Sequence, residues 1–71
     1  MDKEIKVVLL GKNIAKLRKL KGFTQTGLAK TLNISRIHLS KVETAKRRIS
    51  LGLLFKISET LNIKEKDFFE F

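Results

Sequence analysis

TQTGLAKTLNISRIHLSKVE, residues Thr24 to Glu43, has the pattern of two short helices joined by a tight turn. Thr24 is a good N-cap for the first helix, because its hydroxyl accepts a backbone N–H that the helix leaves unpaired. Leu28, Ala29 and Leu32 follow at the i, i+1, i+4 spacing of one apolar face. The first half of this stretch therefore predicts a short amphipathic helix with one buried side.

The turn between the two helices is predicted at Asn33, directly after the last apolar residue. Asn tolerates the left-handed backbone region better than any residue except Gly. Ser35 is the second N-cap, and the second helix is predicted from Arg36 to Glu43. Leu39 and Val42 lie three residues apart and are therefore expected to face inward.

The outward face of this second helix carries the candidate functional residues. It presents Arg36 and Ile37 in its first turn, and Ser40 and Lys41 one turn later. In a helix-turn-helix, the first turn of the second helix enters the major groove of duplex DNA. Arg and Lys pair with guanine O6 and N7, and Ile can contact a thymine methyl group. We therefore predict that Arg36, Ile37, Ser40 and Lys41 read base edges.

Length and composition exclude several classes of protein. The 71 residues predict one domain, 1–71, and a chain of this size buries only about 60% of its unfolded surface. With no Cys and one His, neither a disulfide nor a metal site is expected. The longest apolar run, Val7 to Leu10, is far shorter than the roughly 20 residues of a membrane helix. We expect a soluble, cytoplasmic protein that is not an enzyme and uses no cofactor or small-molecule substrate.

The charge is strongly basic and unevenly distributed. The chain has 16 Lys and Arg against seven Asp and Glu, a net charge of +9. Residues 1–49 carry 13 basic and three acidic side chains, and residues 50–71 carry three and four. Positive charge therefore accompanies the helix pair, as expected of a protein that neutralises phosphates. Charge alone is weak evidence, because many small basic domains are merely soluble or bind RNA or anionic lipid.

An amphipathic helix is predicted before the helix pair. Its apolar stripe has spacings of 3, 4 and 3 residues, at Val7, Leu10, Ile14 and Leu17. Gly11 costs this helix about 1 kcal/mol relative to Ala and would permit a close packing contact. Gly22 is predicted to end the helix. The pattern predicts no conformation for residues 1–6.

A basic loop, residues 44–49, follows the second helix of the pair. Lys46, Arg47 and Arg48 lie where a DNA backbone would pass, although such a triplet in isolation is usually a solvated charge run. Ser50 then caps a helix predicted from Leu51 to Leu61. Its predicted inward face, bordered by Phe55, consists of Leu51, Leu54, Ile57, Ser58 and Leu61.

Leu53 falls outside that stripe and is expected to be exposed or to meet another molecule. Asn62 is predicted to end the helix, and residues 63–69 are expected to form a final short helix with Phe68 turned inward. The remaining apolar side chains exceed what one small core needs. We predict a dimer interface at Leu53, Phe55, Phe69 and Phe71; the alternative is that they close the bottom of the monomer core.

From Leu10 to Phe69 the chain resembles the phage-repressor and Cro-type helix-turn-helix family of DNA-binding regulators. The matching runs are I-x-x-L-R at 14–18, G-F-T-Q at 22–25, L-A at 28–29, I-S at 34–35, L-S-K-V-E at 39–43 and S-L-x-x-L-x-x-I at 50–57. The resemblance implies an all-α fold, a compact five-helix, lambda-repressor-like domain. Small members of the family include phage repressors, controllers of restriction-modification operons, and antitoxins.

The resemblance also implies roles for individual residues. Gln25 matches a position that clamps a DNA phosphate in the family, and Thr44 and Lys46 match backbone contacts beyond the recognition helix. Arg18 and Glu43 match a buried ion pair that ties the first helix to the end of the third. With neighbouring polar and cationic side chains, the predicted phosphate-binding set is Thr24, Gln25, Ser35, His38, Thr44, Lys46, Arg47 and Arg48.

Three positions depart from the family pattern. Ala45 stands where Gly is usual, so the loop must either adopt another conformation or tolerate strain. Gly27 replaces a common Glu and weakens its helix, and Ile49 replaces the usual Pro.

Two functions remain open from the sequence. One is a homodimeric repressor or controller that binds near-palindromic duplex DNA specifically. The other is an antitoxin-type module that binds a partner protein first and DNA secondarily.

Overall fold

The computed structural model describes residues 3–71, with side-chain positions from Glu4 onward. It consists of helices α1 (Lys3–Leu20), α2 (Gln25–Leu32), α3 (Arg36–Glu43) and α4 (Leu51–Leu61), followed by a short 3₁₀ helix, η1 (Glu65–Phe69). The predicted all-α class is confirmed, with α1 beginning at Lys3. The last element was expected as a helix over 63–69 and is a shorter 3₁₀ helix.

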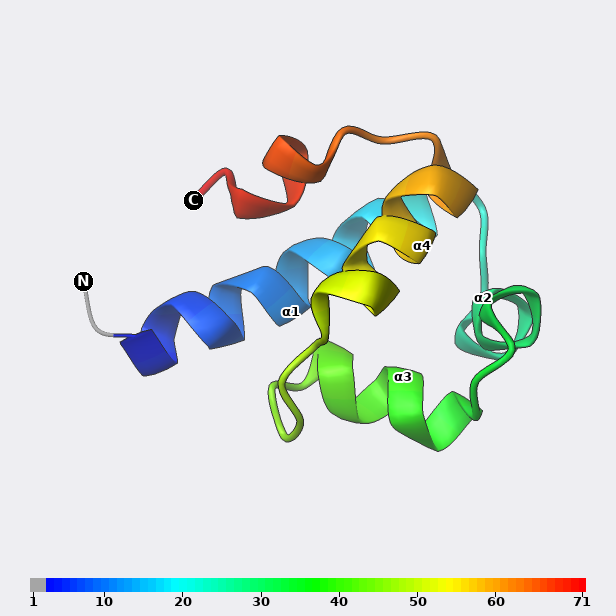
Figure 1. The fold of residues 1–71 in the computed structure, drawn as a ribbon, viewed down its shortest axis with the longest axis horizontal. Helices are drawn as coiled ribbons and strands as arrows, with labels where there is room; N and C mark the ends of the chain where they lie inside the picture. Colours follow the sequence, from blue (N-terminus) through cyan, green and yellow to red (C-terminus); the bar gives the residue numbers. More distant parts are fainter. Residues whose placement is uncertain (1–2) are drawn as a thin grey trace.

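The elements surround one core (Figure 1). Helix α1 packs against α3 and η1, while α2 packs against α3 and α4. Figure 1 shows α3 along the lower edge of the molecule, with α2 on the right and the beginning of α1 and the C-terminal end on the left. The fully buried centre is supplied by every helix and by η1, through Ile14, Leu28, Leu39, Ile57 and Phe68.

The predicted helix boundaries follow from local capping. The hydroxyls of Thr24, Ser35 and Ser50 accept backbone N–H groups three residues later, at 2.9, 2.9 and 3.1 Å. Asn33 and Asn62 end α2 and α4 in the left-handed region, with φ of 59° and 54°. Each side chain satisfies or positions backbone groups that a helix end leaves unpaired.

The predicted inward face of α4 is partly wrong. Leu51 is 69% exposed, whereas Leu53, expected at the surface, is buried in the core with 8% exposed. The reason is that α2 packs against α4 on the Leu53 side, where Leu32 and Leu53 border the same hollow. The assignment of Leu53 to a dimer interface is therefore wrong, because its side chain is consumed by the monomer core.

Gly11 allows α1 to approach the end of α3 closely. A Cβ at this position would lie 2.6 Å from the carbonyl oxygen of Glu43 and 2.8 Å from that of Val42. Both distances are shorter than side-chain carbon atoms tolerate, so only Gly fits here. The expected close contact at Gly11 is thus the backbone of the third helix.

The loop after α3 contains a strained residue. Ala45 has φ of +60°, in the left-handed region that costs residues with a Cβ roughly 1–2 kcal/mol. The amides of Lys46 and Arg47 both donate to the carbonyl oxygen of Lys41, which holds the turn closed. With Ala45 in place of the usual Gly, the loop could either adopt another conformation or tolerate strain. The structure has the strained conformation.

Candidate nucleic-acid interface

Helix α3 is held by one side and exposed on the other. Leu39, Val42 and Glu43 are buried. Arg36, Ile37 and Lys41 are exposed, and Ile37 is 58% accessible. Residues separated by three or four positions share a helix face, so this division follows from the spacing that predicted it.

The four predicted base-reading residues lie together. Arg36, Ile37, Ser40 and Lys41 line one hollow of about 300 Å³, and Thr44 and Lys46 from the following loop complete it. Three cations and no acid therefore border this surface, with one apolar side chain among them. Such a lining suits the acceptor atoms and methyl groups of a DNA major groove.

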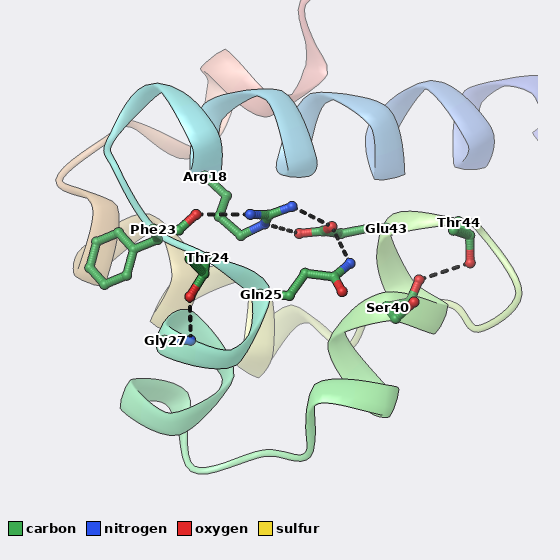
Figure 2. A network of polar contacts seen from close by, with 8 residues as sticks. All are labelled: Arg18, Phe23, Thr24, Gln25, Gly27, Ser40, Glu43 and Thr44. Atoms are coloured by element: carbon green, nitrogen blue, oxygen red, sulfur yellow. Dashed lines mark hydrogen bonds and ion pairs between the residues drawn. The ribbon is translucent and has the colours of Figure 1, made fainter.

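A buried ion pair fixes α3 against α1. The Arg18 Nε atom donates to Glu43 Oε2 at 2.6 Å, and Arg18 Nη2 donates to Glu43 Oε1 at 3.1 Å. Arg18 Nη1 also donates to the Phe23 carbonyl oxygen at 2.8 Å. Arg18 and Glu43 are each 6% exposed, and such two-pronged pairing is what lets a buried charge pair persist. Figure 2 shows this network at the junction of α1, α2 and α3.

Gln25 joins the same network. Its Nε2 atom donates to Glu43 Oε1 at 2.9 Å, so the first residue of α2 is bonded to the last residue of α3 (Figure 2). The turn at residues 33–35 connects the two helices at one end, and this hydrogen bond connects them at the other. Gln25 was expected to contact phosphate; the structure places it half-buried, beside the ion pair.

The other predicted phosphate-binding hydroxyls serve helix ends. Thr24 and Ser35 accept N–H groups as N-caps, and the Thr44 hydroxyl donates to the Ser40 carbonyl oxygen at 2.8 Å. All three are exposed residues. As N-caps, Thr24 and Ser35 lie at the N-termini of α2 and α3. The helix dipole there favours an anion.

The remaining cations divide between two surfaces. Lys46 lines the α3 hollow, and Arg47 is exposed. Arg48 instead turns toward α1, where its Nη2 atom pairs with Glu4 Oε1 at 2.9 Å on the surface. His38 is half-buried and lines a separate hollow between α2 and the beginning of α4. Neither Arg48 nor His38 borders the α3 hollow.

Two of these contacts have no signal in the sequence. Glu4 and Arg48 are 44 residues apart, and no spacing rule connects them. The Gln25 amide and the Glu43 carboxylate are 18 residues apart, and only the predicted proximity of α2 and α3 could have suggested the bond.

The described residues contain no group of His, Cys, Asp or Glu that could hold a metal ion. Within the same part of the chain, no helix is both long and apolar enough to cross a membrane.

Comparison with known proteins agrees with this arrangement. The sequence model of the helix-turn-helix family HTH_3 matches residues 14–68. An uncharacterized HTH-type transcriptional regulator of Bacillus subtilis, YazB, is 42% identical over 53 residues, which are 75% of this chain and 77% of that protein. Another, from Rickettsia conorii, is 39% identical over 61 residues, 86% of this chain. The chain spans about half (49%) of the Rickettsia protein.

A solved structure is also similar. The restriction-modification controller protein C.AhdI from Aeromonas hydrophila superposes with a TM-score of 0.86 and 29% identity, covering 92% of this chain and 98% of its own. The family model, the relatives and the solved structure all indicate a helix-turn-helix regulator, and the exposed cationic face of α3 is consistent with that family. The chain belongs to the helix-turn-helix family of DNA-binding transcriptional regulators.

Proposed function

We propose that this chain is a sequence-specific regulator that binds duplex DNA as a homodimer, with α3 of each copy in a major groove. The observation that carries the proposal is the hollow of α3, where Arg36, Ile37 and Lys41 of the helix and Lys46 of the following loop are exposed. The bonds of Arg18 and Gln25 to Glu43 hold that helix against α1 and α2. Arg36 and Lys41 would read guanine, Ile37 a thymine methyl group, and Ser40 a neighbouring base edge.

Phosphate contacts would flank this reading face. Thr24, Gln25 and Ser35 lie at helix N-termini, where backbone N–H groups and the dipole attract an anion. Thr44, Lys46 and Arg47 would contact the backbone beyond the end of α3. His38 and Arg48 are weaker candidates, because the structure turns them away from the α3 hollow.

A dimer is supported by exposed aromatic side chains. Phe55, Phe69 and Phe71 are each about half exposed, at 50%, 48% and 48%, and large exposed apolar groups commonly mark an interface. A twofold dimer would recognise a near-palindromic operator with half-sites about one helical turn, roughly 34 Å, apart. Because C.AhdI is a restriction-modification controller protein, we propose controller or repressor activity for this chain.

The test is selection of bound sequences from a random DNA pool, followed by binding of two variants to the selected site. Arg36→Ala should cost about 1–3 kcal/mol on that site and relax the preference at one position, because a base contact is lost. Arg47→Ala should weaken binding to the selected site and to random DNA alike. It should also reduce the slope of log affinity against log salt concentration by about one. Equal losses from Arg36→Ala on both DNAs would refute the reading role.

A pool that yields no enriched sequence would refute the function itself. Purification of the native protein with a stoichiometric protein partner, and no DNA preference, would favour the antitoxin-type alternative instead.

A further inference from the structure

Helix α1 has an exposed stripe on the side away from the core. The stripe, here called the outer face of α1, consists of Ile5, Val8, Lys12, Lys16 and Lys19, all exposed. At 3.6 residues per turn, these five positions fall within about 80° of the helix circumference. The opposite side of α1 is buried and packs against α3 and η1. Within the part of the chain that the structure describes, the outer face therefore has no packing partner.

The charge of this face is positive and uncompensated. Residues 5–42 contain no Asp or Glu, and among the described side chains no ion pair or hydrogen bond involves Lys12, Lys16 or Lys19. Like charges three and four residues apart destabilise a helix. The helix dipole favours Lys19, which lies in the last turn, but it does not favour Lys12 in the middle of α1. The fold itself thus gains nothing from this row of cations.

The outer face is separate from the surface proposed to read DNA. None of its five residues lines the α3 hollow. Helix α1 meets the end of α3 at Gly11, which lies about 100° around the helix from Lys12. A molecule bound to the outer face would therefore not need to displace one bound to α3.

The arrangement of apolar and charged groups indicates what kind of molecule fits. Ile5 and Val8, 50% and 42% exposed, occupy one end of the stripe, and the three lysines occupy the other. A nucleic-acid backbone supplies anions but no apolar surface for Ile5 and Val8. A membrane surface binds helices with a wide apolar side, whereas the outer face has two apolar groups in line with its cations. A second helix has the same rise per residue and can match both ends.

We propose that the outer face of α1 docks an acidic amphipathic helix of a partner protein, antiparallel to α1. In that orientation the N-terminal half of the partner helix lies against Lys12, Lys16 and Lys19, and acidic residues are favoured near a helix N-terminus. Apolar residues of its C-terminal half cover Ile5 and Val8. The contact spans about 21 Å, or about 15 residues of the partner. This inference goes beyond the proposed function and does not rest on it.

The experiment uses a synthetic helical peptide of about 15 residues as the probe. It carries three glutamates in its N-terminal half and two leucines in its C-terminal half, and the control peptide has the same residues in reversed order. Amide chemical shifts of the isotope-labelled full chain, recorded during titration at low salt, measure the dissociation constant and locate the site. The shifts should follow residues 5–19, and the reversed peptide should bind more weakly.

Two triple variants, each lacking three exposed cations, test the assignment. One changes the outer face, Lys12→Gln, Lys16→Gln and Lys19→Gln, and the other changes the α3 hollow, Arg36→Gln, Lys41→Gln and Lys46→Gln. Glutamine preserves helix propensity, and thermal unfolding checks that both remain folded. The first variant should raise the dissociation constant of the peptide about tenfold, as expected when three exposed ion pairs are lost. The second should change it less than about twofold.

Equal effects of the two variants, shifts centred on α3, or equal binding of the reversed peptide would overturn the proposal. Three other outcomes would overturn it in favour of a different occupant. A loss of duplex-DNA affinity as large in the first variant as in the second would assign the face to nucleic acid. Binding to phosphatidylserine vesicles that the first variant alone loses, without peptide binding, would assign it to a membrane. Weaker self-association of the first variant in sedimentation would assign it to a second copy.

Discussion

At the scale of single residues, Ala45 has a backbone conformation that is unfavourable for a residue with a Cβ atom. Its φ of +60° is a conformation that Gly adopts freely and Ala does not. Ala45→Gly should therefore stabilise the fold by roughly 0.5–1 kcal/mol, after the flexibility of Gly in the unfolded chain is subtracted. Urea unfolding measures this difference.

Ala15→Gly is the matched control, because Ala15 lies in the interior of α1. The same chemical change there should destabilise by about 1 kcal/mol. If the free energy of unfolding rises for Ala45→Gly and falls for Ala15→Gly, the strain at Ala45 is established. A change of the same sign in both variants would contradict it.

The Arg18–Glu43 pair is the residue-scale feature with the largest expected energy. Glu43→Gln should destabilise by roughly 3–5 kcal/mol, because it leaves the buried guanidinium without its counter-charge. Arg18→Met combined with Glu43→Leu should recover much of this loss, since no charge then remains buried. Denaturant titration of Glu43→Gln, of Arg18→Met and Glu43→Leu separately, and of the double variant measures these effects. A double variant as unstable as the sum of its singles would show that the charge is not the cause.

At the scale of elements, the contact between α1 and α3 depends on the missing side chain of Gly11. Gly11→Ala should improve helix propensity by about 1 kcal/mol, yet the added carbon would meet the carbonyl oxygens at the end of α3. Overpacking of this kind typically costs 1–3 kcal/mol or more, so the net change should be destabilising.

Gly52→Ala is the control for that prediction. Gly52 also lies in a helix, α4, but a Cβ there would meet nothing within 4 Å. It should stabilise the protein by up to about 1 kcal/mol. A calorimetric melting temperature that falls for Gly11→Ala and rises for Gly52→Ala supports the close contact; a rise for both would exclude it.

The elements also show how far sequence reasoning reaches. The N-terminal boundaries of α2, α3 and α4 were predictable, because the hydroxyls of Thr24, Ser35 and Ser50 accept backbone N–H groups only three residues away. The buried side of α4 was predicted incorrectly at Leu51 and Leu53, because it depends on where α2 lies in space. Helical spacing defines the faces of a helix, and only the packing partners decide which face is covered.

The same distinction holds for the candidate site. The outward side chains of α3 were predictable from spacing within eight residues. The turn of Arg48 toward Glu4 was not, since it joins residues 44 positions apart.

At the scale of the whole molecule, salt should act in opposite directions on folding and on DNA binding. The net charge of +9 lies on a body 33 Å long. The screening length falls from about 30 Å at 0.01 M salt to about 10 Å at 0.1 M, so repulsion across the molecule weakens and the melting temperature of the free protein should rise. A shift of about 4–8 °C would correspond to each kcal/mol of repulsion removed.

DNA affinity should decrease over the same range, with a slope of about −0.9 in log–log form for each phosphate neutralised. Thermal melts and fluorescence anisotropy at matched salt concentrations measure the two trends. An affinity that does not change with salt would contradict a phosphate-binding role for the basic surface. A melting temperature that falls as salt rises would contradict the repulsion across the molecule.

The hydrogen bond from Gln25 to Glu43 has a consequence for the speed and cost of recognition. An amide nitrogen carries two hydrogens, and this bond uses one of them to join α2 and α3. In the proposed complex, the second hydrogen would donate to a phosphate oxygen. In the proposed regulator, α3 would already be held against α2 before DNA arrives, so little ordering entropy would be lost on docking. A regulator built in this way should lock onto its operator without first rearranging.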